Sequence, residues 1–223
     1  MKSNHNLSYT LFLFLVVICA WFGIALQLIT AIPNYLAAGK TIARALVLFF
    51  SYFTILTNLI VAVTTSAALF FPTSKFGAFC TKPATITAVT LYIVVVGLVY
   101  NIVLRPLYHP QGWAKVADET VHSVVPVLHL MYWLLFAPKG HIQWKTALSW
   151  LIYPFIYLIY CFVHGMLTSY YPYPFIDVNK IGYAGFWLNS FYMLLLFLFL
   201  SFALIGTDRW LGKKDKAVFS AKV

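Results

Sequence analysis

Six apolar segments, each about as long as a membrane is thick, dominate this sequence. A helix needs about 20 residues to cross roughly 30 Å of hydrocarbon, and the segments cover about residues 9–32, 46–71, 84–104, 120–137, 146–167 and 183–205. The chain is 62% hydrophobic and only 9% charged, whereas soluble proteins carry about 25% charged residues. A lipid-exposed backbone must satisfy its own hydrogen bonds, so the segments should be helical. The sequence therefore predicts an all-α, six-span membrane protein that forms one domain over residues 1–223.

The distribution of Lys and Arg predicts the orientation of these spans. With a cytoplasmic N-terminus, ten of the 15 Lys and Arg residues face the cytoplasm and five face the outer side. Cytoplasmic loops carry an excess of such residues, so both termini are expected inside. The basic tail, residues 206–223, should lie near anionic lipid headgroups. No nucleic-acid-binding module accompanies the net charge of +10, so a nucleic-acid partner is not expected.

Polar side chains in the predicted spans gather in their outer halves. Thr54 lies ten residues below Arg44, or about 15 Å along a helix, and Asn58 follows one turn deeper on the same face. Further polar groups in the outer halves of the other spans are Asn101, Arg105, His122, His129, His164 and Asn189. A polar side chain that faces hydrocarbon costs several kcal/mol. The sequence therefore predicts a polar pocket that opens toward the outer face.

Structural explanations compete with this functional one. Ser and Thr in membrane helices commonly bond the carbonyl one turn back, which accounts well for Ser51, Thr57, Thr64 and Thr65. His129 and Asn189 are equally suited to joining helices. Arg105, which precedes a proline at a helix end, fits a headgroup anchor better than a ligand. Asp118 and Glu119, at the start of the fourth span, fit residues that complement a helix dipole as well as functional ones.

Several common chemistries lack their signatures in this sequence. The motifs GxSxG, HExxH, the Walker loop and GxGxxG do not occur, and no acidic pair lies within a span. The three cysteines, Cys19, Cys80 and Cys161, are scattered without metal-ligand spacing. We therefore expect no bound metal, no cofactor and no disulfide.

Three short stretches resemble a known membrane-protein family. They are "YFTILTN" in the second span, "DETVHSVVPVLHLMYWLLF" in the fourth and "YPYPFIDVNKIGY" before the sixth. They are similar to the androgen-induced and androgen-dependent transmembrane proteins and their bacterial six-span relatives. Eukaryotic members of that family hydrolyse fatty acid esters of hydroxy fatty acids with an intramembrane threonine nucleophile and a histidine. The resemblance implies the same activity here.

The resemblance assigns roles to individual residues. The family's threonine falls on Thr54, its histidine on His122, and its "YPF" on Tyr173, Pro174 and Phe175. In some members, the asparagine lies one position nearer to the threonine than Asn58 lies to Thr54. The register of the second helix is therefore open by one residue, and Thr57 is an alternative nucleophile. His122 lies nearer the outer end of its helix than Thr54 does. Contact between the two side chains therefore requires helix tilt or a later start of the second helix; otherwise His129 is the base.

The predicted reaction is acyl transfer to Thr54 with His122 as the base. Asn58, Asn101 and Arg105 are candidates to bind the oxyanion or a substrate carboxylate, and His164 or Asp177 to orient the imidazole. The expected partner is a membrane lipid or lipid ester. A different class remains open, a non-enzymatic small transporter or lipid-binding protein. The short chain without eukaryotic sorting signals favours a bacterial inner membrane, and the oligomeric state stays open.

Overall fold

The computed structural model describes the backbone of residues 7–220 and the side chains of residues 7–213. This part of the chain is helical with no strand, which confirms the all-α prediction. Contacts divide the chain into two compact units, Met1–Ala137 and Pro138–Val223. Each unit is described by itself.

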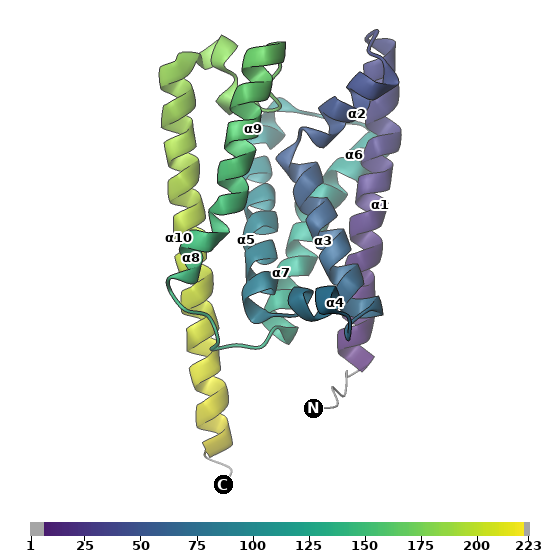
Figure 1. Ribbon diagram of the computed structural model, residues 1–223. Helices are drawn as coiled ribbons and strands as arrows, with labels where there is room; N and C mark the ends of the chain where they lie inside the picture. The colour runs from purple at the N-terminus through teal and green to yellow at the C-terminus, as the bar shows by residue number, and fades with distance from the viewer. Residues whose placement is uncertain (1–6, 221–223) are drawn as a thin grey trace. The chain divides into compact units, whose positions relative to one another are not determined.

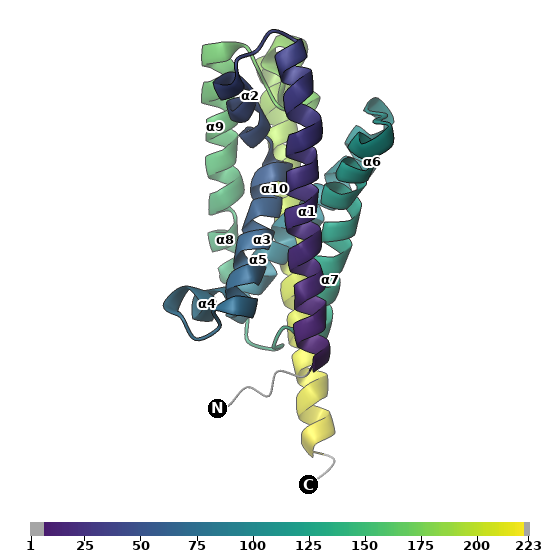
Figure 2. The same cartoon turned by 90° about the vertical axis from the view of Figure 1, so that its right-hand side faces the viewer.

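The described part of the first unit contains seven α-helices, two π turns and one 3-10 turn, which Figure 1 shows as a helical bundle. Its elements are α1 (Leu7–Ala37), α2 (Ile42–Phe50), α3 (Phe53–Phe70), α4 (Lys75–Cys80), α5 (Pro83–Val99), the π turn η1 (Tyr100–Leu104), the 3-10 turn η2 (Arg105–Leu107), α6 (Gly112–Glu119), the π turn η3 (Thr120–Val124) and α7 (Val125–Phe136). Helix α1 packs against α3 and α6, and α5 packs against α3 and α7. Figures 1 and 2 show α2 and α6 at one end of this unit and α4 at the other.

Two glycines let helices approach the π turn η3 closely. A Cβ atom on Gly23 of α1 would lie 2.9 Å from side-chain carbons of both Thr120 and Val121. A Cβ atom on Gly97 of α5 would lie 3.4 Å from the His122 carbonyl oxygen in η3 and 3.0 Å from Pro126, which follows η3 in α7. Small residues permit close packing of membrane helices, where lipid supplies no hydrophobic driving force between them. The segment that carries His122 is therefore packed between α1 and α5.

The helix predicted over residues 46–71 is wrong at its start. The structure ends α2 at Phe50 and begins α3 at Phe53, with Tyr52 in an extended conformation between them (φ −82°, ψ 129°). The Ser51 hydroxyl donates to the Val47 carbonyl at the end of α2. No proline or glycine marks this break, which is why the apolar pattern ran across it. The break places Thr54 in the first turn of a new helix.

Five helices among the described residues are long and apolar enough to cross a membrane. They are Leu7–Ala37, Phe53–Phe70, Pro83–Leu107, Thr146–Thr168 and Val178–Lys213. Many of their exposed side chains are large and apolar, such as Phe14 and Ile18 on α1 and Phe155 and Ile156 on α9 (Ile152–Thr168). Exposed apolar surface of this extent is typical of helices that face lipid. The protein is a multi-pass membrane protein.

The fourth predicted span, residues 120–137, is not among these five helices. It belongs to a helical stretch from Gly112 to Phe136 that the π turn η3 interrupts, and its regular part, α7, has 12 residues. Polar residues reduce its apolar character, including His122 and His129, which are both buried.

The second unit contains α8 (Thr146–Trp150), α9, the 3-10 turn η4 (Pro174–Ile176) and α10 (Val178–Ser220). Gly182 interrupts the start of α10 with a positive φ of 68°, a conformation that favours glycine. Regular helix therefore begins close to the predicted residue 183. It continues well past the predicted end at residue 205, so the basic tail is helical up to Ser220. Residues 221–223 of that tail lie outside the described residues.

Polar contacts attach the loop before α8 to α10. The carboxylate of Asp208, which is fully buried, accepts a hydrogen bond from the Ile142 backbone N–H at 3.2 Å. Gly140 and Gly212 meet backbone to backbone, and a Cβ atom on Gly212 would lie 2.4 Å from the Gly140 Cα atom. This close approach requires glycine at position 212.

Candidate active site

Thr54 and His122 lie in contact although 68 residues separate them in the sequence. The distance between His122 Nε2 and Thr54 Oγ1 is 3.3 Å. Both residues are buried, with exposed fractions of 6% for Thr54 and 8% for His122. Thr54 belongs to the first turn of α3, and His122 is the third residue of the π turn η3. The late start of α3, one of the options that the sequence left open, therefore accompanies their contact.

The surroundings of the imidazole define which nitrogen carries its proton. His122 Nδ1 lies 2.9 Å from the backbone carbonyl oxygen of Asp118 and 3.0 Å from its carboxylate Oδ1. Both oxygens are acceptors when the carboxylate is ionised, so Nδ1 must be the protonated nitrogen that donates to them. In the neutral imidazole, Nε2 then presents its lone pair to the Thr54 hydroxyl. This is the tautomer that a general base needs.

Asp118 is the carboxylate of this site, a role that its position in the sequence does not reveal. Its side chain is buried, with 3% exposed, and lies one helical turn before His122. Its place at the start of the fourth predicted span fits a residue that complements a helix dipole equally well. The four-residue spacing from Asp118 to His122 is the signal that could have identified it, because such residues share a helix face.

Tyr100 contacts both Asp118 and His122. Its hydroxyl donates a hydrogen bond to Asp118 Oδ2, which leaves Oδ1 for the imidazole. Its ring stacks on the His122 ring, with the centroids 3.8 Å apart and the planes 12° from parallel. Tyr100 is buried and begins the π turn η1. No sequence pattern distinguished it from the other 14 tyrosines.

Asn58 and Asn101 bind backbone carbonyl groups of the turn that carries His122. Asn58 Nδ2 donates to the carbonyls of Thr54 (2.9 Å) and Val121 (3.1 Å). Asn101 Nδ2 donates to the carbonyls of Gly97 (2.8 Å) and His122 (3.2 Å). A π turn disturbs the regular hydrogen-bond ladder of a helix, and such turns are frequent at functional sites. The two amides therefore fix η3 from α3 and from η1, in place of the oxyanion or substrate contacts predicted for them.

Replacing Asn58 by Leu is expected to lower the stability of the protein. The change keeps the approximate shape but leaves the buried Val121 carbonyl without its side-chain donor, which costs about 1–3 kcal/mol. Asn101→Leu is the matched control, since Asn101 is exposed whereas Asn58 is fully buried. Thermal unfolding in detergent measures both. Equal melting temperatures for Asn58→Leu and the wild type would contradict the assignment.

Arg105 forms an ion pair with Glu119 at the edge of the site. Its two terminal nitrogens lie 2.6 and 2.7 Å from the two carboxylate oxygens, and Nη2 also lies 3.1 Å from Ser123 Oγ. The hydrogen bonds from Arg105, with a smaller contribution from Ser123, lower the pKa of Glu119 below its ordinary value. A substrate carboxylate would have to compete with this bidentate pair. The structure therefore favours a structural role for Arg105.

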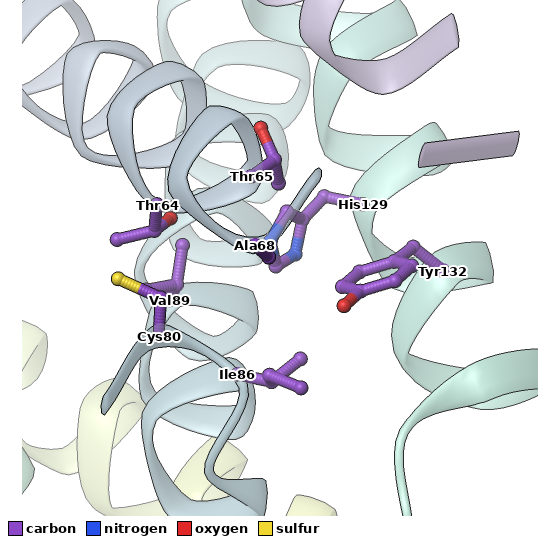
Figure 3. Close-up of a pocket in the computed structure, with 8 residues that line it drawn as sticks. All are labelled: Thr64, Thr65, Ala68, Cys80, Ile86, Val89, His129 and Tyr132. Atoms are coloured by element: carbon purple, nitrogen blue, oxygen red, sulfur yellow. The ribbon is translucent and has the colours of Figure 1, made fainter. Parts of the chain in front are cut away.

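His129 lies deeper in the first unit and contacts a different threonine. Its Nδ1 is 3.2 Å from Thr90 Oγ1, and the side chain is 1% exposed. It lines a small cavity together with Thr64, Thr65, Ala68, Cys80, Ile86, Val89 and Tyr132 (Figure 3). It follows His122 by seven residues, about 10 Å along a helix. The structure thus pairs Thr54 with His122, the first of the two candidate bases.

The remaining predicted site residues belong to the second unit and have local partners there. His164 Nδ1 lies 3.2 Å from the Tyr170 carbonyl oxygen. Asp177 accepts from the Asn179 N–H at 3.1 Å and pairs with Lys180 at 3.5 Å, as expected at the start of α10. Asn189 Nδ2 donates to the Phe175 carbonyl at 2.8 Å. Within the first unit, the carboxylate that contacts His122 Nδ1 is that of Asp118.

Tyr173 and Phe175, which the resemblance singled out with Pro174, stack on each other in the turn before α10. Their ring centroids are 5.3 Å apart and their planes 10° from parallel. Tyr173 is buried. These contacts explain the two aromatic residues as packing elements of the second unit.

Comparisons of this chain with protein-family models, with curated proteins and with solved structures find no match.

Proposed function

We propose that this protein is an intramembrane hydrolase of lipid esters, with Thr54 as the nucleophile and His122 as the general base. The observation that carries the proposal is the 3.3 Å contact between Thr54 Oγ1 and His122 Nε2. A threonine hydroxyl is a weak nucleophile until a base removes its proton, and a neutral imidazole suits that task near pH 7. The Asp118 contacts at Nδ1 support it, because they leave the Nε2 lone pair toward the hydroxyl.

The reaction proceeds in two acyl-transfer steps. His122 Nε2 takes the Thr54 proton while Oγ1 attacks the ester carbonyl carbon and forms a tetrahedral intermediate. The intermediate collapses to an acyl-threonine, and the alcohol leaves with the proton from Nε2. Water then attacks the acyl-threonine, again losing a proton to Nε2, and the carboxylic acid leaves as Thr54 Oγ1 regains its proton. Asp118 orients the imidazole and stabilises its positive form throughout.

Membrane topology supports a lipid substrate. We propose six spans, with the stretch that contains η3 and α7 as the fourth and both termini in the cytoplasm. In the first unit, Lys40, Arg44 and Lys115 lie on or beside α2 and α6, at the end opposite α4 (Figures 1 and 2). Thr54, ten residues below Arg44, then lies in the outer half of the membrane. The bilayer delivers an apolar ester there from the side.

The resemblance to the androgen-induced and androgen-dependent transmembrane proteins suggests the substrate class. Fatty acid esters of hydroxy fatty acids, or similar lipid esters, are the substrates that it implies. We further propose a bacterial inner membrane as the location.

Labelling with a fluorophosphonate probe tests the proposal. The purified protein in detergent should form a covalent adduct on the peptide that contains Thr54, and Thr54→Ala and His122→Ala should lose it. Thr57→Ala should keep the adduct, which separates the two candidate nucleophiles of the second span. Thermal unfolding confirms that each variant is folded. Equal labelling of Thr54→Ala, His122→Ala and the wild type would contradict the proposal that the protein is an enzyme and favour the non-enzymatic transporter or lipid-binding protein.

A further inference from the structure

We infer that Tyr100 is a positioning residue for hydrolysis, which acts on Thr54 through Asp118 and His122. The inference rests on the proposed function and extends it by one residue. Tyr100 is 4% exposed, its hydroxyl and its ring contact those two groups, and the Arg105 guanidinium carbon lies 5.4 Å from its ring centroid. Neither the sequence pattern nor the resemblance assigns it a role.

The phenol hydroxyl of Tyr100 fixes the carboxylate of Asp118. A carboxylate has two oxygens and rotates about its Cβ–Cγ bond unless both are held. Here Oδ2 accepts from Tyr100 and Oδ1 lies 3.0 Å from His122 Nδ1. The hydrogen bond from the phenol also withdraws negative charge from the carboxylate, because a donor stabilises the ionised form. Tyr100 therefore limits how strongly Asp118 attracts a proton onto the imidazole.

The ring of Tyr100 fixes the plane of the imidazole. With the centroids 3.8 Å apart and the planes nearly parallel, the imidazole cannot rotate about its Cβ–Cγ bond without colliding with the phenol ring. Rotation would move Nε2 away from Thr54. An aromatic face also attracts a cation more than a neutral ring. His122 becomes positive only as Thr54 loses its proton, so this attraction is stronger in the transition state than in the ground state.

The two π turns bring these groups together. Tyr100 is the first residue of η1, and His122 is the third residue of η3, and the two turns contact each other. Asn101, the next residue of η1, donates to the His122 carbonyl at 3.2 Å. The side chains of Tyr100 and Asn101 thus hold the imidazole and the backbone of one residue from the same turn.

Tyr100→Phe tests the hydroxyl, because it keeps the ring and removes the donor. With an ester substrate in detergent micelles, kcat of Tyr100→Phe should fall about tenfold with little change in KM, because Oδ2 is no longer held and the carboxylate, although more negative, is less often aligned with Nδ1. The kcat of Tyr100→Leu, which also removes the ring, should fall about 100-fold. The acidic limb of the pH profile of kcat/KM should move to higher pH in Tyr100→Phe. Asp118 then carries more negative charge, which stabilises the positive imidazole, while Arg105 and Glu119, the other charged groups beside the site, are unchanged. Tyr92→Phe, which removes a buried hydroxyl from α5, is the matched control and should leave this limb in place.

A double-mutant cycle with Asp118→Asn separates positioning from general packing. If the Tyr100 hydroxyl acts through Asp118, Tyr100→Phe should lower kcat by less than about twofold in the Asp118→Asn background. An equal cost in both backgrounds, or a wild-type kcat and pH profile for Tyr100→Phe, would overturn the inference.

An imidazole resonance provides a readout without turnover. By NMR, the Nδ1–H resonance of His122, which reports its hydrogen bond to Asp118, should shift in Thr54→Ala when Tyr100→Phe is added, and an unchanged resonance would overturn the inference. Hydrolysis that persists in Thr54→Ala at the wild-type rate would instead reject the proposed function. The two failures are therefore distinguishable.

Discussion

Thr54→Val is expected to reduce ester hydrolysis by about 10³-fold or more while the protein remains folded. Valine keeps the branched shape of threonine but has no hydroxyl to form the acyl-enzyme. Loss of a nucleophile removes the covalent route altogether, and residual catalysis then comes from substrate binding alone. The measurement is kcat/KM for a lipid ester in detergent micelles, together with the melting temperature of each variant.

The controls for Thr54→Val separate chemistry from structure. Thr54→Ser restores a hydroxyl and should recover much of the activity. A purely structural hydroxyl would behave differently, since the loss of one interhelical hydrogen bond costs about 1 kcal/mol of stability and leaves turnover intact. A Thr54→Val protein with a lowered melting temperature and full kcat would therefore reject Thr54 as the nucleophile.

The fold class followed from the sequence because membrane helices obey a simple rule of length and apolarity. Five predicted spans correspond to helices that meet this rule. The points at which these helices are interrupted could not be predicted from the sequence. The break at Ser51 and Tyr52 and the π turns η1 and η3 involve no proline or glycine. Packing and side-chain hydrogen bonds define these features, and a hydropathy pattern contains neither.

The pair Thr54 and His122 could be proposed from depth and resemblance, but its surroundings could not. Helical spacing placed Asn58 and Asn101 near the pocket, yet their amides donate to carbonyls of the π turn. Their role depends on a backbone irregularity that the sequence did not reveal. Asp118 precedes His122 by four residues in the sequence, but an acidic residue at the start of a helix can equally serve to complement the helix dipole. Only the contact at Nδ1 distinguishes the two explanations.

Asp118→Asn is expected to lower kcat by about 10²–10³-fold. In known catalytic triads, the same change costs about 10⁴-fold because the histidine adopts the wrong tautomer. The loss should be smaller here. The backbone carbonyl of Asp118 lies 2.9 Å from His122 Nδ1 and continues to accept its proton after the side chain is changed. What disappears is the negative charge that stabilises the imidazolium as Thr54 loses its proton.

Glu119→Gln is the matched control for Asp118→Asn. It removes the neighbouring carboxylate, which pairs with Arg105 at 2.6 Å and lies on a partly exposed side chain. We expect it to affect kcat by less than about threefold, because an exposed ion pair contributes little and does not contact His122. The measurements are kcat and the melting temperature of both variants. Equal losses of kcat in the two variants would show that general negative charge near the helix start matters, rather than the contact between Asp118 and the imidazole.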